Sequence, residues 1–267
     1  MCGTRADADD VVQEAFLRWT NTDRAGVHSP RAFLSTVVTR LCIDRRREIQ
    51  ARKETYVGPW LPEPIVETES GAAEDRIEVA ESVSLALLHV LETLSPVERA
   101  AYLLRKVFDY EYCEISEIIG KPVVNCRQLV SRAEAHVLSQ RPRFEASPDD
   151  VRRICDQFLS ACTTGDLDGL VRLLADDVVI YTDGGGKVAA ALRPLEGTSR
   201  ASRFLLGVFK KAPATARALR VQVNGQAGLA FFDGETLIAV WTLDVVGDRI
   251  RRGYLIRNPD KLARVKL

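Results

Sequence analysis

Polar side chains around residue 127 have the chemistry that reads nucleic-acid bases. Arg127 can pair with the O6 and N7 atoms of guanine, and Gln128 can pair with adenine. In a helix that begins after Pro122, both would point away from the apolar stripe that includes Cys126 and Val130. The residues that we predict to contact DNA on this outward face are Lys121, Asn125, Arg127, Gln128, Ser131 and Arg132.

The preceding segment supplies the element that would position this face. Ser95-Pro96-Val97-Glu98 is a capping box with proline at the first helical position, so a helix begins there. A short apolar helix over 112–119 ends at Gly120, and Pro122 then opens the next helix. A helix, a turn with glycine and a second helix predict a helix-turn-helix. A three-helix bundle with a merely solvated polar face is the alternative.

The N-terminal part also predicts helices. Apolar residues recur at helical spacing from Val11 to Trp19, and Ser29-Pro30 supplies an N-cap followed by proline. The helix that begins there has an apolar stripe and, on its other side, Arg40 and a basic run that ends at Arg47. Two helices cannot close a good core alone, so we expect this module to be N-terminally incomplete.

From about Pro148 the pattern changes to an α+β domain. Helices are predicted over 149–163, 166–174 and 199–211, and a strand over 178–183. Four alternating runs follow, separated by tight-turn pairs such as Asn224-Gly225 and Asp233-Gly234, which predicts a curved antiparallel sheet. The predicted strands cover 217–223, 227–232, 235–245 and 249–257.

Composition narrows the class of protein. The 267 residues carry 37 basic and 37 acidic side chains, but residues 54–98 hold ten acidic groups and one basic group. This stretch contains a proline- and glycine-rich connector that we expect to be extended and largely solvated. The sequence has no long apolar run, and its six cysteines and three histidines lack zinc-site spacing. We expect a cytoplasmic protein with reduced thiols, no metal and no cofactor.

Several of these segments resemble bacterial sigma factors. Residues 8–19 resemble the helix of the second conserved region that binds the RNA polymerase core, and residues 29–47 resemble the adjoining helix that melts and reads the −10 element. Residues 93–138 resemble the fourth region, which reads the −35 element. Only a short connector replaces the third region, as is typical of the extracytoplasmic-function (ECF) group.

Three further motifs resemble an ECF subgroup with a fused C-terminal SnoaL-like domain. They are Trp60-Leu61-Pro62-Glu63-Pro64, Asp183-Gly184-Gly185-Gly186-Lys187 and Asn258-Pro259-Asp260-Lys261-Leu262. The resemblance implies all-α region 2 and region 4 modules followed by an α+β, cystatin-like cone. The implied boundaries are region 2 at 1–53, an acidic linker at 54–81, region 4 at 82–143 and the SnoaL-like domain at 144–267.

The resemblance also implies roles for residues. It implies that RNA polymerase core and promoter DNA are the partners and that the C-terminal domain modulates activity. The residues implied to bind the core are Asp10, Gln13, Glu14, Phe16 and Trp19, although Phe16 and Trp19 also fit core aromatics. Those implied to meet the −10 strand are Arg40, Asp44 and Arg45. The implied interdomain and regulatory residues are Trp60 and those of the two C-terminal motifs.

Residues 183–187 follow a predicted strand but lack the phosphate-loop and dinucleotide fingerprints. We interpret them as an interdomain contact in which Lys187 pairs with an acidic surface such as the linker; a plain loop and a ligand site are the alternatives. SnoaL-like folds have a pocket, for which the candidate lining is Tyr181, Asp183, Trp241 and Tyr254. A small ligand there, or an enzyme with a DNA-binding appendage, is the competing hypothesis. A third is that the acidic connector mimics nucleic acid and shields the basic helices. Residues 137–267 contain no histidine and no carboxylate pair with diagnostic spacing, so the sequence gives little support for acid–base catalysis there.

Overall fold

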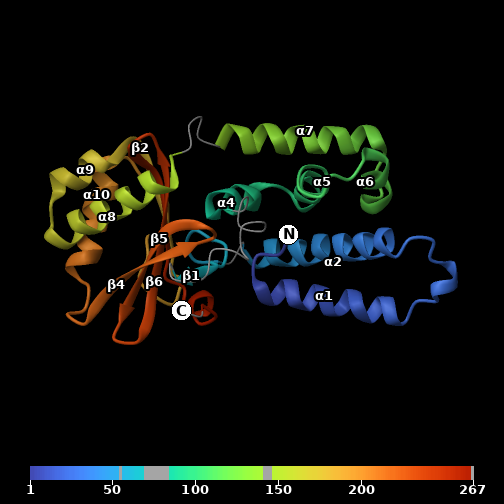
Figure 1. Ribbon diagram of the computed structural model, residues 1–267, viewed down its shortest axis with the longest axis horizontal. Coiled ribbons are helices and arrows are strands. Elements are labelled where there is room, and N and C mark those ends of the chain that lie inside the picture. Colours follow the sequence, from blue (N-terminus) through green and yellow to red (C-terminus); the bar gives the residue numbers. More distant parts are fainter. Residues whose placement is uncertain (54–55, 69–83, 141–145, 266–267) are drawn as a thin grey trace. The chain divides into compact units, whose positions relative to one another are not determined.

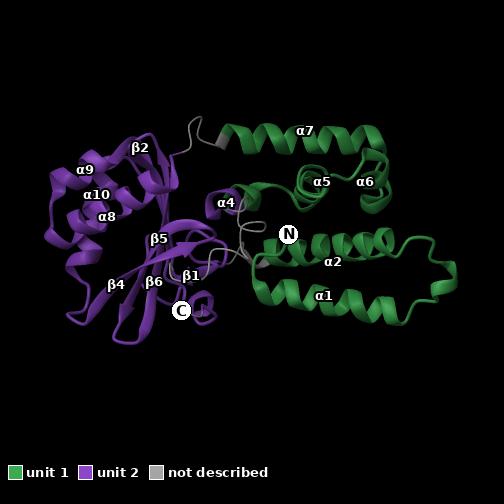
Figure 2. Cartoon of the chain, viewed as in Figure 1, with its two compact units in different colours: residues 1–55, 89–141 green, residues 56–88, 142–267 purple. Residues whose placement is uncertain are grey.

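The computed structural model describes four stretches of the chain: residues 1–53, 56–68, 84–140 and 146–265. Its contacts divide the chain into two units, which Figure 2 colours separately. Unit 1 comprises residues 1–55 and 89–141, and unit 2 comprises residues 56–88 and 142–267. In the described ranges, no helix combines the length and the apolarity that crossing a membrane requires.

Unit 1 begins with two long helices, α1 (Arg5–Thr20) and α2 (Pro30–Lys53), with a short 3-10 helix η1 (Arg24–Gly26) between them (Figure 1). The predicted cap is present, because the amide of Ala32 donates to the Ser29 hydroxyl at 3.2 Å. Trp19, near the C-terminal end of α1, packs against Phe33, near the N-terminal end of α2, with ring centroids 5.7 Å apart.

The rest of unit 1 is a helical module built from the end of α4 (Leu85–Thr93), α5 (Pro96–Lys106), α6 (Tyr112–Ile119) and α7 (Val123–Gln140). Ser95 and Glu98 form the predicted capping box at α5. Gly120 ends α6 with φ of 72°, a conformation that favours glycine. The core between α5, α6 and α7 is apolar, so the helix-turn-helix prediction is confirmed. The predicted helix start near residue 77 lies outside the described residues.

Unit 2 contains a seven-stranded sheet with the order β1-β4-β5-β6-β7-β2-β3. The strands are β1 (Val66–Thr68), β2 (Leu174–Asp183), β3 (Leu195–Glu196), β4 (Ala216–Val223), β5 (Gln226–Asp233), β6 (Thr236–Val246) and β7 (Arg249–Ile256). The predicted hairpins are present. The sheet is mixed rather than antiparallel, because β2 pairs with β7 in parallel. The helix α10 (Thr198–Lys210) lies between β2 and β4 in the chain, so these strands are not joined by a tight turn, and β2 lies beside the last strand instead.

Both faces of this sheet are covered. Neighbouring strand residues point to opposite faces, and Trp241 packs into one apolar core while Val240 packs into the other. The Trp241 core is closed by α8 (Pro148–Thr164), α9 (Leu167–Leu173) and α10 (Thr198–Lys210). The Val240 core is closed by residues 61–66, by Leu85 and by α11 (Pro259–Leu262).

The described part of the connector is therefore structured, and the expectation of a largely solvated segment is wrong for residues 56–68. Leu61 is completely buried, and β1 pairs antiparallel with β4, with Val66 opposite Val223. The acidic composition predicted solvation, but the apolar residues between the acids cover a sheet face that would otherwise lie in water. Residues 69–83, where most of the other acidic groups lie, are outside the described ranges.

Candidate functional sites

All six residues predicted to contact DNA lie on the exposed face of α7 or just before it. The opposite face buries Cys126 and Val130 in the helix-turn-helix core, and Ala133 and Val137 are buried farther along the helix. The helix therefore presents amide, guanidinium and hydroxyl groups outward from an apolar base, as groove recognition requires. Their contact with DNA stays a prediction.

Neighbouring side chains hold part of this face in place. The Arg127 guanidinium lies 5.4 Å from the ring centroid of Tyr112 on α6. Arg132 approaches Glu98 at 3.5 Å, with the arginine side chain two-thirds exposed. Such exposed contacts are worth about 1 kcal/mol or less, so a phosphate or a base can compete for either arginine.

The residues implied to meet the −10 strand make contacts inside unit 1. Arg40 donates through Nε to the backbone oxygen of Ile118 at 3.3 Å, which joins α2 to the C-terminal end of α6. Arg45 is held by Asp7 at 2.8 Å and by Asp10 at 3.3 Å. Asp44 pairs with an arginine on its own helix. Single-stranded DNA would have to displace Arg40 and Arg45 from these partners.

Helix α1 presents an apolar strip to solvent. Phe16 is 61% exposed, Val12 64% and Leu17 48%, so Phe16 is not a core aromatic. Asp10, Gln13 and Glu14 are exposed alongside the strip. Trp19, in contrast, is half-buried against Phe33. An exposed apolar strip bordered by polar groups is typical of a docking surface.

A buried charged cluster joins α2 to α4 and α5. The Glu92 carboxylate forms ion pairs with the guanidinium groups of Arg46, at 2.8 Å, and Arg99, at 3.0 Å. Both arginines are almost completely buried. Burial lowers the pKa of Arg99, an effect that Glu92 opposes. Ser35 and the Tyr110 hydroxyl, 2.5 Å apart, add a second polar link between the same modules. These groups pack the two helical modules of unit 1 against each other.

In unit 2, six residues form what we call the Asp183 cluster: Tyr56, Trp60, Leu61, Asp183, Asn258 and Lys261. Asp183 is completely buried at the end of β2. Its carboxylate accepts hydrogen bonds from the Tyr56 hydroxyl, from the Leu61 amide at 2.9 Å and from Lys261 Nζ at 2.5 Å. The two C-terminal motifs and the connector motif therefore meet at one carboxylate.

The remaining members complete the cluster. Lys261 also donates to the backbone oxygen of Leu61, and its ammonium lies 3.7 Å from the ring centroid of Trp60. Asn258 donates to the Tyr56 hydroxyl at 2.9 Å. Burial, reinforced by the hydrogen bond to Asp183, raises the pKa of Tyr56, so its hydroxyl stays a donor. The sequence motifs predict an interdomain role for Trp60, Asp183, Asn258 and Lys261 and include Leu61, but they do not include Tyr56.

The loop at residues 183–187 contains three glycines, and other groups approach its backbone closely. Gly185 has φ of 63°, and a Cβ there would lie 2.5 Å from Nδ2 of Asn258. A Cβ on Gly186 would lie 3.1 Å from Val57. Lys187 pairs with Asp260 at 2.7 Å, and both side chains are more than half exposed. A pairing of Lys187 with the acidic linker stays a prediction, because residues 69–83 lie outside the described ranges. Leu262 joins the apolar core, and Pro259 is exposed.

The four residues predicted to line a common pocket lie on two faces of the sheet. Trp241 stacks on Phe158 with centroids 5.0 Å apart, in the helix-covered core. Tyr254 is buried in the other core and stacks on Tyr181 with centroids 5.6 Å apart. Trp241 and Tyr254 therefore do not line one common pocket.

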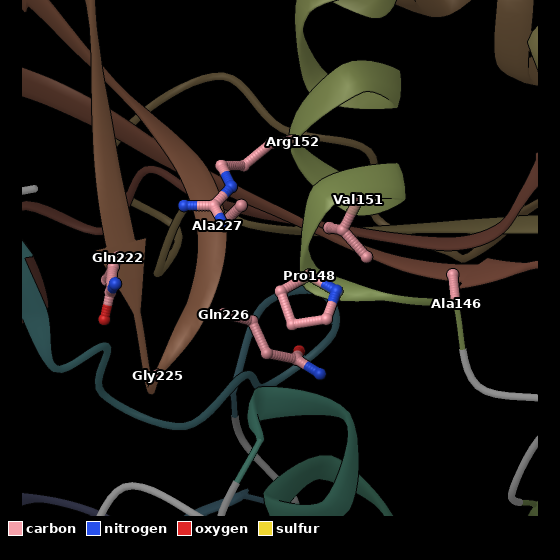
Figure 3. A pocket seen from close by; sticks show the side chains of 8 residues that line it. All are labelled: Ala146, Pro148, Val151, Arg152, Gln222, Gly225, Gln226 and Ala227. Carbon is pink, nitrogen blue, oxygen red and sulfur yellow. The ribbon is translucent and has the colours of Figure 1, made fainter. Parts of the chain in front are cut away.

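A different pocket lies near the start of α8, beside the hairpin between β4 and β5 (Figure 3). Its lining is Ala146, Pro148, Val151, Arg152, Gln222, Gly225, Gln226 and Ala227. None of these residues is a carboxylate, a histidine or a cysteine, so the lining offers no general base or nucleophile of those types.

Comparisons with known proteins agree with this arrangement. The sigma-70 region 2 family matches residues 1–52, and the sigma-70 region 4 family matches residues 84–137. ECF RNA polymerase sigma factor SigJ of Mycobacterium tuberculosis is 37% identical over 98% of this chain and 87% of its own length. Probable ECF sigma factor SigI of that species is 29% identical over 98% and 88%.

The whole architecture is also shared. The crystal structure of SigJ from Mycobacterium tuberculosis aligns with a TM-score of 0.77 and 32% identity, covering 99% of this chain and 92% of that one. The alignment includes both helical modules and the C-terminal sheet domain, so the predicted order of all-α modules followed by an α+β domain is confirmed. Sequence and structure together establish that this chain belongs to the ECF RNA polymerase sigma factors, with regions 2 and 4 followed by an α+β C-terminal domain.

Proposed function

We propose that this sigma factor directs the RNA polymerase core to promoters whose −35 element is read by α7. The six exposed polar residues at 121–132 supply base and phosphate contacts, since a helix with this face fits the major groove. Arg40, Asp44 and Arg45 meet the −10 strand after leaving their present partners. The protein acts in the cytoplasm, where its partners are RNA polymerase core and promoter DNA.

The core polymerase docks on α1. Asp10, Gln13, Glu14 and Phe16 supply the contact surface, and Trp19 fixes the helix against α2. The boundaries that we propose are region 2 at 1–53, a linker at 54–81, region 4 at 82–143 and the SnoaL-like domain at 144–267.

The SnoaL-like domain sets activity in cis by holding the connector. The observation that carries this proposal is the Asp183 cluster, in which one buried carboxylate binds two residues of the connector and the lysine of α11. The connector leads from region 2 toward region 4, so the state in which it is held controls how these modules engage a promoter. The donors that surround Asp183 occupy its carboxylate, which supports a structural role for this residue rather than a role as a general base.

The variant Asp183→Asn tests this proposal, and Lys187→Ala serves as its control. The asparagine removes the negative charge beside buried Lys261, and breaking a buried ion pair costs about 3–5 kcal/mol. We expect faster hydrogen exchange at the Leu61 amide and altered transcription from a cognate promoter with core polymerase. Lys187→Ala removes only an exposed pair and should change both measurements little.

The outcome can separate structure from regulation. If Asp183→Asn frees the connector, as the Leu61 amide reports, and transcription still equals that of the parent protein, the regulatory proposal is wrong. Unchanged exchange at Leu61 would show that the cluster does not hold the connector.

A further inference from the structure

Two cysteines of region 2 lie beside each other although 40 positions separate them. Cys2 precedes α1 and Cys42 lies in the middle of α2, and their sulfur atoms are 3.8 Å apart. Cys42 is buried, and Cys2 is partly accessible. A disulfide requires the two sulfur atoms to approach to about 2.05 Å, so its formation would bring this pair about 1.8 Å closer.

The surroundings of the pair make one sulfur a nucleophile. The hydrogen bond with Cys42 lowers the pKa of Cys2 to about 7, although burial and the charge of Asp7 oppose the shift. The charges of the N-terminal ammonium and of Arg46 act in the lowering direction. The same hydrogen bond raises the pKa of Cys42, so Cys42 is the donor when Cys2 is a thiolate; between two thiols either sulfur can donate. Arg46 and Arg99 share one carboxylate, Glu92, so this buried cluster carries excess positive charge that favours a thiolate.

We propose that Cys2 and Cys42 are a redox-active dithiol that hydrogen peroxide converts to an intramolecular disulfide. The Cys2 thiolate attacks one peroxide oxygen, the O–O bond breaks, and the departing hydroxide takes a proton to become water. The Cys42 sulfur then attacks the Cys2 sulfenic acid. The S–S bond forms as the S–O bond breaks, and hydroxide leaves with the Cys42 proton as water. The two thiols lose two electrons, and the peroxide gains them.

The division of roles follows from accessibility. Cys2 is the residue that a solvent-borne oxidant reaches, and Cys42 resolves the intermediate from inside the fold. The disulfide would tie the residues before α1 to α2. It would also consume the thiolate beside Arg46 and Arg99, at the point where Arg99 donates to the backbone oxygen of Met1 at 3.1 Å.

Treatment of the full chain with hydrogen peroxide tests the proposal. After denaturation, iodoacetamide should modify four of the six cysteines instead of all six, and peptide mapping should find Cys2 joined to Cys42. Cys113→Ser, which removes an exposed cysteine of α6, should form the same bond at the same rate. Oxidation of Cys113 with Cys2 and Cys42 both still free, or disulfides only between chains, would overturn the proposal.

Two variants of Cys42 test the hydrogen bond separately. Without oxidant, Cys42→Ala removes the donor and should slow alkylation of Cys2 at pH 7 roughly threefold, since less thiolate forms. Cys42→Ser keeps a donor and should restore that rate, while peroxide then leaves Cys2 as a trappable sulfenic acid. Equal alkylation rates in all three proteins would show that Cys42 does not activate Cys2.

Discussion

Arg127 and Gln128 are exposed on α7, so their side chains contribute little to stability and are free to contact bases. Substituting both by alanine should leave the helix content and thermal unfolding of the protein nearly unchanged. Each lost base contact costs about 1–3 kcal/mol, so promoter-dependent transcription should fall at least tenfold. Ser139→Ala, near the end of the same helix, is the matched control. Transcription that stays at the parent level would exclude this face as the −35 reader.

The outward face of α7 could be predicted from the sequence alone, because the exposure of each residue in a helix follows from the local spacing of apolar residues. Cys126, Val130 and Ala133 define the buried side at helical spacing, and the polar residues between them must face out. Tyr56 could not be found that way. Its partner Asp183 is 127 positions away, and nothing within a few residues of Tyr56 reveals that pairing.

The exposed strip on α1 is a property of the whole helix. A globular helix normally buries its large apolar residues, but Phe16, Val12 and Leu17 remain mostly in solvent. Phe16→Ala should therefore leave the unfolding temperature nearly unchanged and weaken core polymerase binding by about 2 kcal/mol, as an aromatic anchor does. Val171→Ala, at an exposed apolar position of α9, should bind core like the parent. A large loss of stability in Phe16→Ala would instead show that the strip is part of the fold.

The elements themselves were largely predictable from local signals. Ser29-Pro30, the Ser95 capping box and Gly120 mark helix ends, and Asn224-Gly225 marks a hairpin. The parallel pairing of β2 with β7 was not predictable, because β3 to β6 and α10 separate these strands in the chain and only tertiary packing makes them neighbours. One feature of the sequence indicated that residues 56–68 pack against the fold: Trp60 lies among prolines in an acidic stretch.

At the scale of the whole molecule, the packing of regions 2 and 4 in unit 1 describes a closed state. The positions −10 and −35 lie about 25 base pairs apart, which corresponds to roughly 85 Å along B-DNA. Helix α7, with 18 residues, is only about 27 Å long. Because α2 contacts α6 directly through Arg40 and Ile118, unit 1 cannot reach both elements as it stands. Promoter binding must separate the two regions.

Glu92 is the residue whose loss should favour that separation, because it neutralises Arg46 and Arg99 at the contact. Glu92→Gln leaves two buried guanidinium groups without their carboxylate, which costs the closed state about 3–5 kcal/mol. We expect small-angle scattering of the full chain to show a larger radius, and open-complex formation with core polymerase to accelerate. Glu134→Gln removes a partly exposed pair within region 4 and should leave both measurements unchanged. A folded Glu92→Gln protein with the radius of the parent would mean that apolar contacts, rather than this carboxylate, hold the regions together.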